Sequence, residues 1–190
     1  MKRIAIFASG SGSNAEKIGE YFADRNDVQV TLILTNNPQA GVIQRARKLH
    51  IPVVIFDRKT FYDTEQILEL LINNKIDLIV LAGFMMLIPA KLVEAFPDRM
   101  VNIHPALLPK YGGKGMYGSF VHEAVVANKE KESGITIHFV NQHYDEGNII
   151  FQTSCEVLET DSPDDVADKI HVLEHKHFPK IIDEVLSGLN

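Results

Sequence analysis

Asn102 and His104 are separated by one residue at the end of a short apolar segment that begins at Met100. Alternate side chains of an extended backbone point to the same side, so this amide and this imidazole share one side of a strand end. Both groups can donate hydrogen bonds to an oxyanion that develops during a reaction. Pro105 and Pro109 then restrict the backbone of an irregular loop. The alternative interpretation is a buried strand end with a hydrogen-bonded histidine and no chemical role.

A glycine-rich turn, SGSGSN at residues 9–14, follows an apolar segment over 3–8 and precedes a helical pattern. Free backbone N–H groups at a helix N-terminus bind anions. Gly12 permits close backbone approach, and Ser13 or Asn14 can cap the helix or bind phosphate oxygens. The spacing G-x-G-x-x-A also fits a dinucleotide loop, but the second predicted strand ends without the carboxylate that a ribose diol requires. The turn therefore predicts a site for one phosphate, with a tight turn and a capped helix as the alternative.

An acidic loop at residues 141–148, NQHYDEGN, joins the last two predicted strands. If this loop folds over the edge of the sheet, one of its carboxylates contacts His104. The negative charge would then raise the imidazole pKa above its ordinary value of about 6.5. Chemistry alone does not choose between Asp145 and Glu146, and solvated acidic surface is the alternative for both.

The remaining histidines and the cysteine indicate little chemistry. His171, Glu174 and His175 form H-x-x-E-H on the last predicted helix, a spacing found in one class of zinc proteases. A third ligand is not evident, so we expect no metal site. His138 lies in an alternating strand and is interpreted as a core or supporting residue, and Cys155 as a packing residue. A single cysteine allows no intramolecular disulfide and fits a reducing cytoplasm.

Composition excludes several broad classes of protein. The 190 residues carry a formal net charge of -6 and are 45% hydrophobic, which predicts one ordinary domain rather than a nucleic-acid-binding surface. The chain has no apolar run of ~18 residues, so no membrane span is expected. The apolar N-terminal segment is too short for a signal peptide and is interpreted as the first strand. We therefore expect a cytoplasmic protein.

Strands and helices alternate along the first half of the chain. Strands are expected at 3–8, 28–34, 53–56, 77–82 and from 100, and helices after the glycine turn and at 41–50, 61–73 and 89–96. Further expected elements are a helix at 120–128, strands at 134–140 and 149–158, and a helix at about 164–186 that bends before Pro179. This order predicts a doubly wound, mostly parallel α/β sheet with a C-terminal antiparallel hairpin and a long final helix.

One domain over 1–190 is expected, with a phosphate-binding half at 1–100 and a catalytic half at 101–190. Ligands of such sheets bind outside the carboxyl ends of the strands. The glycine turn, the segment after Ala82 and the Asn102–His104 pair all fall on that edge.

Four segments together resemble the phosphoribosylglycinamide formyltransferase family, folate-dependent enzymes of purine synthesis. They are SGSGSN at 9–14, AGFMMLIP at 82–89, NIHPALLPKYGG at 102–113 and HYDEGNII at 143–150. The motif N-x-H-P-x-L-L-P marks the wider superfamily that uses 10-formyltetrahydrofolate, and the S-G-x-G-S-N loop narrows the match. The resemblance covers nearly the whole chain in order.

The resemblance implies a Rossmann-like formyltransferase fold and transfer of a formyl group from 10-formyltetrahydrofolate to the amine of glycinamide ribonucleotide, without a metal. It implies that Asn102, His104 and Asp145 are catalytic. It further assigns ribonucleotide contacts to Gly12, Ser13, Asn14 and Glu174, and folate contacts to Lys59, Met85, Met86, Leu87, Ile88, Asn102 and Val140. The expected partners are these two small molecules, and the protein is expected to be a monomer or homodimer.

The chain departs from the family at two places, and three rival functions follow from the same motifs. Met86 replaces an arginine common in relatives, and the loop at 112–118 is longer than usual and lacks an early histidine. A methionyl-tRNA formyltransferase would need a basic C-terminal domain, whereas this sequence ends at Asn190. A formyltetrahydrofolate deformylase usually carries an N-terminal regulatory domain. A non-catalytic sensor of phosphate ligands would not need the intact catalytic trio.

Overall fold

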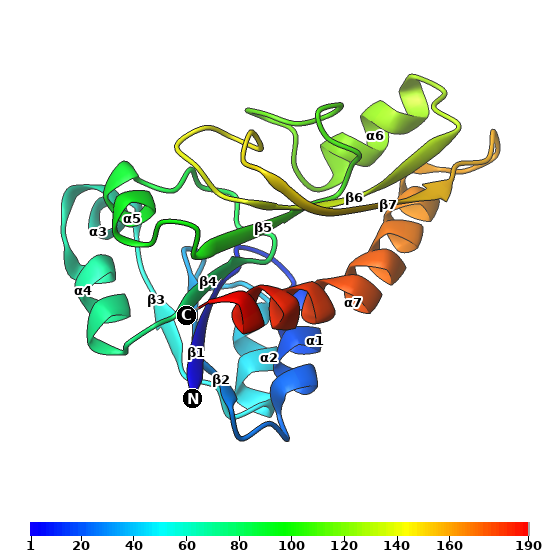
Figure 1. Ribbon diagram of the computed structural model, residues 1–190. Coiled ribbons are helices and arrows are strands. Elements are labelled where there is room, and N and C mark those ends of the chain that lie inside the picture. The colour runs from blue at the N-terminus through cyan, green and yellow to red at the C-terminus, as the bar shows by residue number, and fades with distance from the viewer. Residues whose placement is uncertain (190) are drawn as a thin grey trace.

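Seven strands form a single sheet in the order β3-β2-β1-β4-β5-β6-β7 in the computed structural model, which describes residues 1–189 (Figure 1). The first five strands are parallel to one another: β1 Lys2–Phe7, β2 Val28–Thr35, β3 Val53–Ile55, β4 Leu78–Leu81 and β5 Met100–His104. The last two, β6 Glu132–Phe139 and β7 Ile149–Glu156, are antiparallel. The predicted doubly wound sheet with a C-terminal hairpin is confirmed, and the hairpin extends the same sheet.

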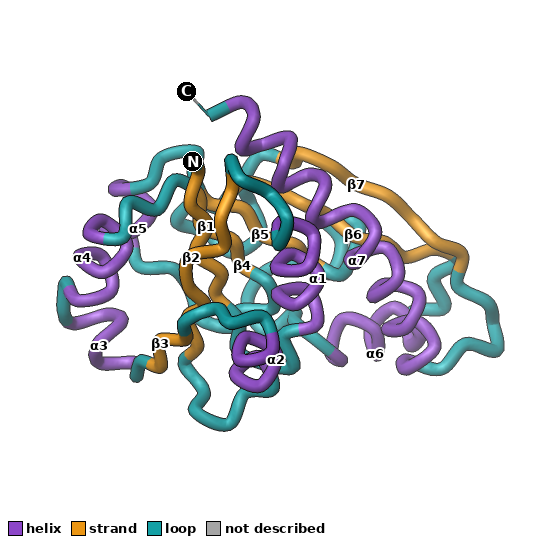
Figure 2. Tube along the Cα trace, turned by 90° about the horizontal axis from the view of Figure 1, so that it is seen from below, coloured by secondary structure: helices purple, strands orange, loops and turns teal. Residues whose placement is uncertain are grey.

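Helices cover both faces of the sheet (Figure 2). The structure contains α1 Ser13–Phe22, α2 Val42–Lys48, α3 Arg58–Asp63, α4 Gln66–Asn73, α5 Ala90–Ala95, α6 Ser119–Ala127 and α7 Pro163–Gly188. Helices α1, α2 and α7 pack into one hydrophobic cluster, and α3, α4 and α5 pack into a second on the opposite face. Helices therefore shield both faces of the sheet from solvent, which explains why all four residues of the central strand β4, LIVL, are buried.

The single helix predicted over 61–73 is wrong. The structure has two helices, α3 and α4, and Thr64 between them is extended, with φ -127° and ψ 166°. The Thr64 hydroxyl donates to the carbonyl of Thr60 at 2.8 Å and accepts from the N–H of Gln66 at 3.3 Å. A threonine hydroxyl that bonds nearby backbone groups in this way competes with the helical ladder, and the sequence periodicity does not reveal that competition.

Helix α7 starts where the sequence predicts and runs past its internal proline. Ser162 and Asp165 form a capping box in which the Ser162 hydroxyl accepts from the Asp165 N–H at 3.2 Å and the Asp165 carboxylate accepts from the Ser162 N–H at 2.8 Å. Pro163 occupies the first turn, where a missing N–H costs nothing. Pro179 lies inside the helix, whose axis changes direction along its length in Figure 1. None of the described helices is long and apolar enough to cross a membrane.

Candidate active site

Strand β5 presents Asn102 and His104 at its carboxyl end, on one side of the sheet, as the sequence predicts. The three other residues of the strand are fully or almost fully buried and hold it in the core. Asn102 pairs with His138 across the β5–β6 ladder, and His104 pairs with Thr136. His104 is only 4% exposed, so its ring lies in a low-dielectric wall rather than in solvent.

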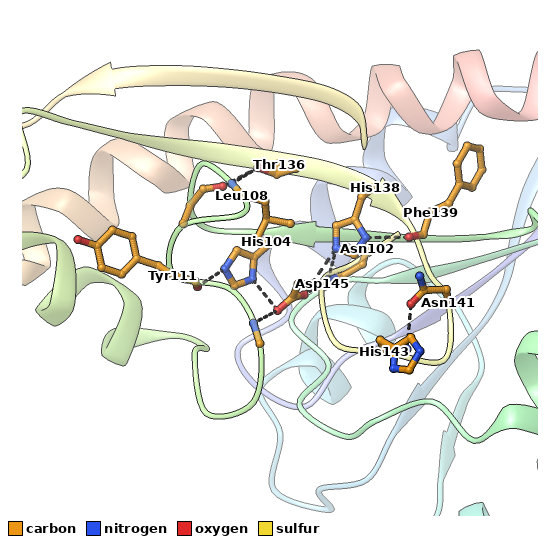
Figure 3. Close-up of polar contacts among 12 residues, drawn as sticks. Asn102, His104, Leu108, Tyr111, Thr136, His138, Phe139, Asn141, His143 and Asp145 are labelled. Atoms are coloured by element: carbon orange, nitrogen blue, oxygen red, sulfur yellow. Dashed lines mark hydrogen bonds and ion pairs between the residues drawn. The ribbon is translucent and has the colours of Figure 1, made fainter. Parts of the chain in front are cut away.

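Asp145 is the carboxylate that faces this pair (Figure 3). Its Oδ2 lies 3.6 Å from His104 Nδ1, and its Oδ1 accepts from Asn102 Nδ2 at 3.4 Å. The N–H of Gly113 donates to Asp145 Oδ2 at 3.0 Å. Glu146 is exposed, so the structure resolves the choice that chemistry left open. Asp145 itself has φ 56°, a left-handed backbone that is uncommon outside glycine and is found at constrained sites.

Gly147 allows the loop of Asp145 to turn back against the sheet. A Cβ at this position would lie 1.7 Å from the carbonyl oxygen of Phe139, so no larger residue fits without movement of the loop. The N–H of Phe139 donates to the carbonyl of Asn148 at 2.9 Å and ties the two arms of the hairpin together. The position of Asp145 therefore depends on a glycine two residues away.

His138, on the neighbouring strand β6, contacts both Asn102 and Asp145. Its Nδ1 lies 2.8 Å from the carbonyl of Phe139, which can only accept, so Nδ1 carries the proton of a neutral ring. Its Nε2 then accepts from Asn102 Nδ2 at 3.1 Å and lies 3.6 Å from Asp145 Oδ1. This buried ring holds the Asn102 amide with its nitrogen toward the carboxylate, which is the supporting role that the sequence left open.

The expected rise in the pKa of His104 is wrong. Burial lowers the pKa of this imidazole below its ordinary value, and this effect outweighs the charge of Asp145 and the carbonyl of Tyr111, which both raise it. Burial alone would raise the pKa of Asp145, but the polar groups around the carboxylate, among them the Gly113 N–H, outweigh burial and lower it. Asp145 is therefore the charged member of the pair, and His104 becomes a cation only in acid or when further negative charge develops beside it.

Eight of the expected residues line one cavity of about 500 Å³. They are Gly12, Ser13, Asn14, Met85, Asn102, His104, Asp145 and Glu174. The glycine turn after β1 forms one part of its wall, and the Asn102–His104–Asp145 group forms another. The cavity lies at the carboxyl ends of β1, β4 and β5, where ligands of doubly wound sheets bind.

The glycine turn leaves the first turn of α1 without a side-chain cap. Ser13 and Asn14 therefore do not cap the helix, and the N–H groups there remain available to an anion. Gly12 has φ 76°, and a Cβ on it would lie 2.5 Å from Val42 of α2, so packing on α2 also requires glycine here. Asn14 Nδ2 donates to Glu174 Oε2 at 2.8 Å, which joins α1 to α7 across the cavity wall.

Comparisons with known proteins agree with this geometry. The formyl transferase family model matches residues 2–182. The chain is 39% identical to phosphoribosylglycinamide formyltransferase of Bacillus subtilis, over 100% of this chain and 97% of that protein. The chain belongs to the phosphoribosylglycinamide formyltransferase family. The resemblance inferred from the sequence motifs is thus confirmed.

Solved structures of this family have the same fold. The phosphoribosylglycinamide formyltransferase of Bacillus halodurans is 37% identical with a TM-score of 0.88, over 98% of this chain and 96% of that one.

A plant relative is longer than this chain. The chloroplastic phosphoribosylglycinamide formyltransferase of Arabidopsis thaliana is 40% identical over 95% of this chain. The present chain spans 64% of that plant protein, which is less than two thirds of its length.

Several residues that the family resemblance assigned to folate lie outside the lining of the cavity. They are Lys59, Met86, Leu87, Ile88 and Val140. Lys59 is exposed on α3, Ile88 is in the core, and Met86 and Val140 pack against the hydrophobic cluster of the α3–α5 face. The Leu87 carbonyl accepts from the Tyr62 hydroxyl at 2.9 Å. Among the residues 85–88, only Met85 reaches the cavity, and its side chain is 49% exposed.

Several further residues that line the 500 Å³ cavity were not predicted from the sequence of this chain. They come from the loop after β4, the long 113–118 loop, α6, the 141–148 loop and α7, and include Phe84, Met116, Tyr117, His122, Tyr144, Ile170 and His171. His122 is 5% exposed, and burial together with the nearby His171 and His104 lowers its pKa. A histidine in an apolar helix has no spacing that marks it as a site residue, so only the packing of α6 against the cavity reveals it.

The residues of the H-x-x-E-H spacing on α7 lie at or beside the wall of the cavity. His171 and Glu174 line the cavity, and the His175 ring stacks on His171 with centroids 6.1 Å apart. Residues 1–189 hold no group of three or more histidine, cysteine, aspartate or glutamate side chains arranged to bind a metal. Burial raises the pKa of Glu174, while the Asn14 amide opposes that rise. The net effect favours a protonated carboxyl at this position.

Proposed function

We propose that this chain transfers a formyl group from 10-formyltetrahydrofolate to the glycyl amine of glycinamide ribonucleotide. One observation supports this most directly: a single cavity joins uncapped N–H groups at the start of α1 to the Asn102–His104–Asp145 group. A substrate with a phosphate at one end and an amine at the other fits those two sites. The B. subtilis relative, which the chain matches over its full length, bears the same activity in its name.

In this proposal the ribonucleotide lies along the cavity. Its phosphate accepts from the N–H groups near Ser13 and Asn14, and its sugar contacts Glu174, whose protonated form can donate as well as accept. The amine then reaches the end of β5. Phosphate binding belongs to residues 1–100 and formyl transfer to residues 101–190.

The folate carries the formyl group to the same point. Asn102 and Met85 contact it from the cavity wall, and Met86, Leu87, Val140 and Lys59 form the neighbouring surface along which its remainder extends, while Ile88 lies in the core. Met86 offers no charge to the folate, so apolar contact replaces an ionic one at that position.

The reaction proceeds by direct attack of the neutral amine on the formyl carbon. A tetrahedral oxyanion forms, and Asn102 Nδ2 and His104 Nδ1 stabilise it. Both nitrogens lie within 3.6 Å of the Asp145 carboxylate, so both can reach one negative group, with His104 Nδ1 acting as a donor once the ring is protonated. The carbon–nitrogen bond to the folate then breaks. The amine loses one proton and the folate nitrogen gains one, through a water that Asp145 orders.

The lowered pKa of His104 gives the imidazole a defined part in this step. The ring is mainly neutral before the reaction, takes up a second proton from water at Nδ1 as negative charge develops on the formyl oxygen, and returns that proton when the oxyanion collapses. Asp145 remains anionic and stabilises the imidazolium. The pair thus stabilises the oxyanion more strongly than it stabilises the ground state, which is the condition for a higher kcat.

The test is to mix purified protein with 10-formyltetrahydrofolate, with and without glycinamide ribonucleotide, and to follow loss of the formyl group. Loss that requires the ribonucleotide, with formylglycinamide ribonucleotide as product, is the expected result. Equal loss without the ribonucleotide would instead identify a hydrolase. Binding of both ligands without turnover would identify a sensor.

A further inference from the structure

Tyr111 makes two contacts that connect the His104 ring to a distant part of the chain. Its backbone carbonyl lies 2.7 Å from His104 Nε2, which donates because a carbonyl only accepts. Its side-chain hydroxyl donates to Glu130 Oε1 at 2.9 Å. Glu130 lies in the connection between α6 and β6, so the two contacts link separate elements.

The backbone of Tyr111 is in an uncommon conformation. Its φ is 56°, in the left-handed region that residues with a Cβ seldom occupy. Such a conformation persists only where surrounding contacts determine it. Figure 3 shows the Tyr111 carbonyl directed at the His104 ring while its phenol points away from the ring. The phenol is therefore the part of Tyr111 through which another element can hold this backbone in place.

Glu130 is suited to hold the phenol. Lys110 Nζ lies 3.1 Å and 3.2 Å from its two carboxylate oxygens, and Lys110 with the Tyr111 hydroxyl lowers the pKa of Glu130. Glu130 is thus anionic at neutral pH, and a hydroxyl that donates to an anion makes a stronger hydrogen bond than one between neutral groups.

We propose that Glu130, through the hydroxyl of Tyr111, positions His104 for formyl transfer. Neither residue lines the ligand cavity; both line a separate cavity of about 250 Å³ together with Lys110 and Ser133. They therefore act on His104 and not on the substrates, and both are positioning residues. This inference rests on the proposed role of His104 in formyl transfer.

The same loop also holds the second member of the pair. Two residues after Tyr111, the N–H of Gly113 donates to Asp145 Oδ2 at 3.0 Å. A displacement of Tyr111 would therefore move the Tyr111 carbonyl away from His104 and, with it, the Gly113 N–H away from Asp145. Since both ring nitrogens of His104 face groups held by this loop, its position sets both the tautomer and the orientation of the imidazole.

Tyr111→Phe tests the proposal because it removes only the hydroxyl. We expect kcat to fall about five- to tenfold, the change that one lost hydrogen bond produces, with KM for both substrates unchanged. The Tyr111 carbonyl raises the pKa of His104 against burial and the neighbouring His138, so its displacement lowers that pKa further even though Asp145 is intact. An NMR titration of the His104 ring measures this shift and does not depend on overall stability.

Variants of Glu130 separate positioning from packing. Glu130→Ala is expected to match Tyr111→Phe, the double variant is expected to lose no more than either alone, and Glu130→Gln, which keeps an acceptor oxygen, is expected to restore most of kcat. The matched control is Glu132→Gln, an exposed carboxylate of the same second cavity. It should leave kcat and the titration unchanged.

Two outcomes distinguish failure of this inference from failure of the proposed function. A wild-type protein that transfers formyl groups, with Tyr111→Phe and Glu130→Ala lowering only the melting temperature, would overturn the positioning role. A wild-type protein without formyl transfer would overturn the proposed function. The His104 titrations would then still decide whether Glu130 and Tyr111 position the ring.

Discussion

At the scale of single residues, the site depends on how one carboxylate and two nitrogen donors share a buried wall. Asp145 contacts both Asn102 and His104, and His138 orients the amide from the opposite strand. Burial keeps His104 mainly neutral, whereas the polar contacts of Asp145 keep its carboxylate ionised. In the proposed reaction, the charge of the His104–Asp145 pair therefore changes as the oxyanion forms.

Asn102→Ala removes one donor from the oxyanion. We expect kcat to fall by ~10²–10³, the effect of one oxyanion-hole donor, with the melting temperature little changed. Steady-state kinetics and thermal unfolding measure the two quantities. A variant with near-normal kcat would exclude Asn102 from catalysis.

Asp145→Asn keeps the size of the side chain and removes its charge. The pKa of His104 should then fall further, because the charge of Asp145 is the main influence opposing burial. The imidazolium exists only below that pKa, so kcat should fall by about 10² or more at neutral pH and the deficit should narrow as pH decreases. NMR titration of the His104 ring and a pH profile of kcat measure both effects.

Glu146→Gln is the matched control for that variant, because Glu146 is the adjacent, exposed carboxylate. It should leave the titration and the rate unchanged. If Asp145→Asn behaves like Glu146→Gln, the carboxylate at 145 has no part in the reaction.

At the scale of elements, the site is assembled from the ends of strands and the loops that follow them. Strand β5 supplies two residues in register, the β6–β7 hairpin returns Asp145 over them, and α1 presents its N-terminus to the same cavity. The hairpin loop can do this only because Gly147 allows contact with the Phe139 carbonyl.

Gly147→Ala tests this dependence of the hairpin. A Cβ would meet the Phe139 carbonyl oxygen at 1.7 Å, so the loop must move and carry Asp145 away from His104. We expect a loss of kcat close to that of Asp145→Asn and a lower pKa of His104 in the NMR titration. Gly188→Ala, where a Cβ would meet nothing within 4 Å, is the control. Normal kcat in Gly147→Ala would show that the loop reaches its active position in another way.

At the scale of the whole molecule, the final helix closes the cavity against the first. Asn14 of α1 and Glu174 of α7 are 160 residues apart in the chain, and their hydrogen bond is buried. Burial raises the pKa of Glu174, so the folded state binds a proton that the unfolded state releases. By linkage, this group's contribution to stability is greatest below its ordinary pKa and falls as pH rises through the raised one.

Glu174→Gln should therefore stabilise the protein at neutral pH. The amide keeps an acceptor for Asn14 and never ionises, and a gain of about 1 kcal/mol would raise Tm by about 2–4 °C for a domain of this size. Thermal unfolding at several pH values should show the gain near neutrality and its disappearance in acid. A gain that is equal at all pH values would contradict the ionisation argument. The ribonucleotide should bind the variant about as well as the wild type, because the glutamine amide donates and accepts as the protonated carboxyl does.

The strand–helix order, the glycine turn and the Asn102–His104 pair could be predicted from the sequence, because each depends on neighbours within a few residues. Periodicity, glycine positions and side-chain alternation are local properties. The hydroxyl of Thr64 that divides α3 from α4 is local too, but it competes with an equally good helical pattern and was missed.

The tertiary structure decided which carboxylate faces His104, which direction its pKa takes and which residues complete the cavity. Asp145 and Glu146 are chemically alike, and only the left-handed turn of the hairpin separates them. The sign of the His104 shift depends on the balance between burial and charge, which no spacing encodes. Contacts between residues far apart in the sequence bring His122, Tyr111 and Glu130 near the site. Such contacts depend on how all the surrounding elements pack, so no local pattern in the sequence predicts them.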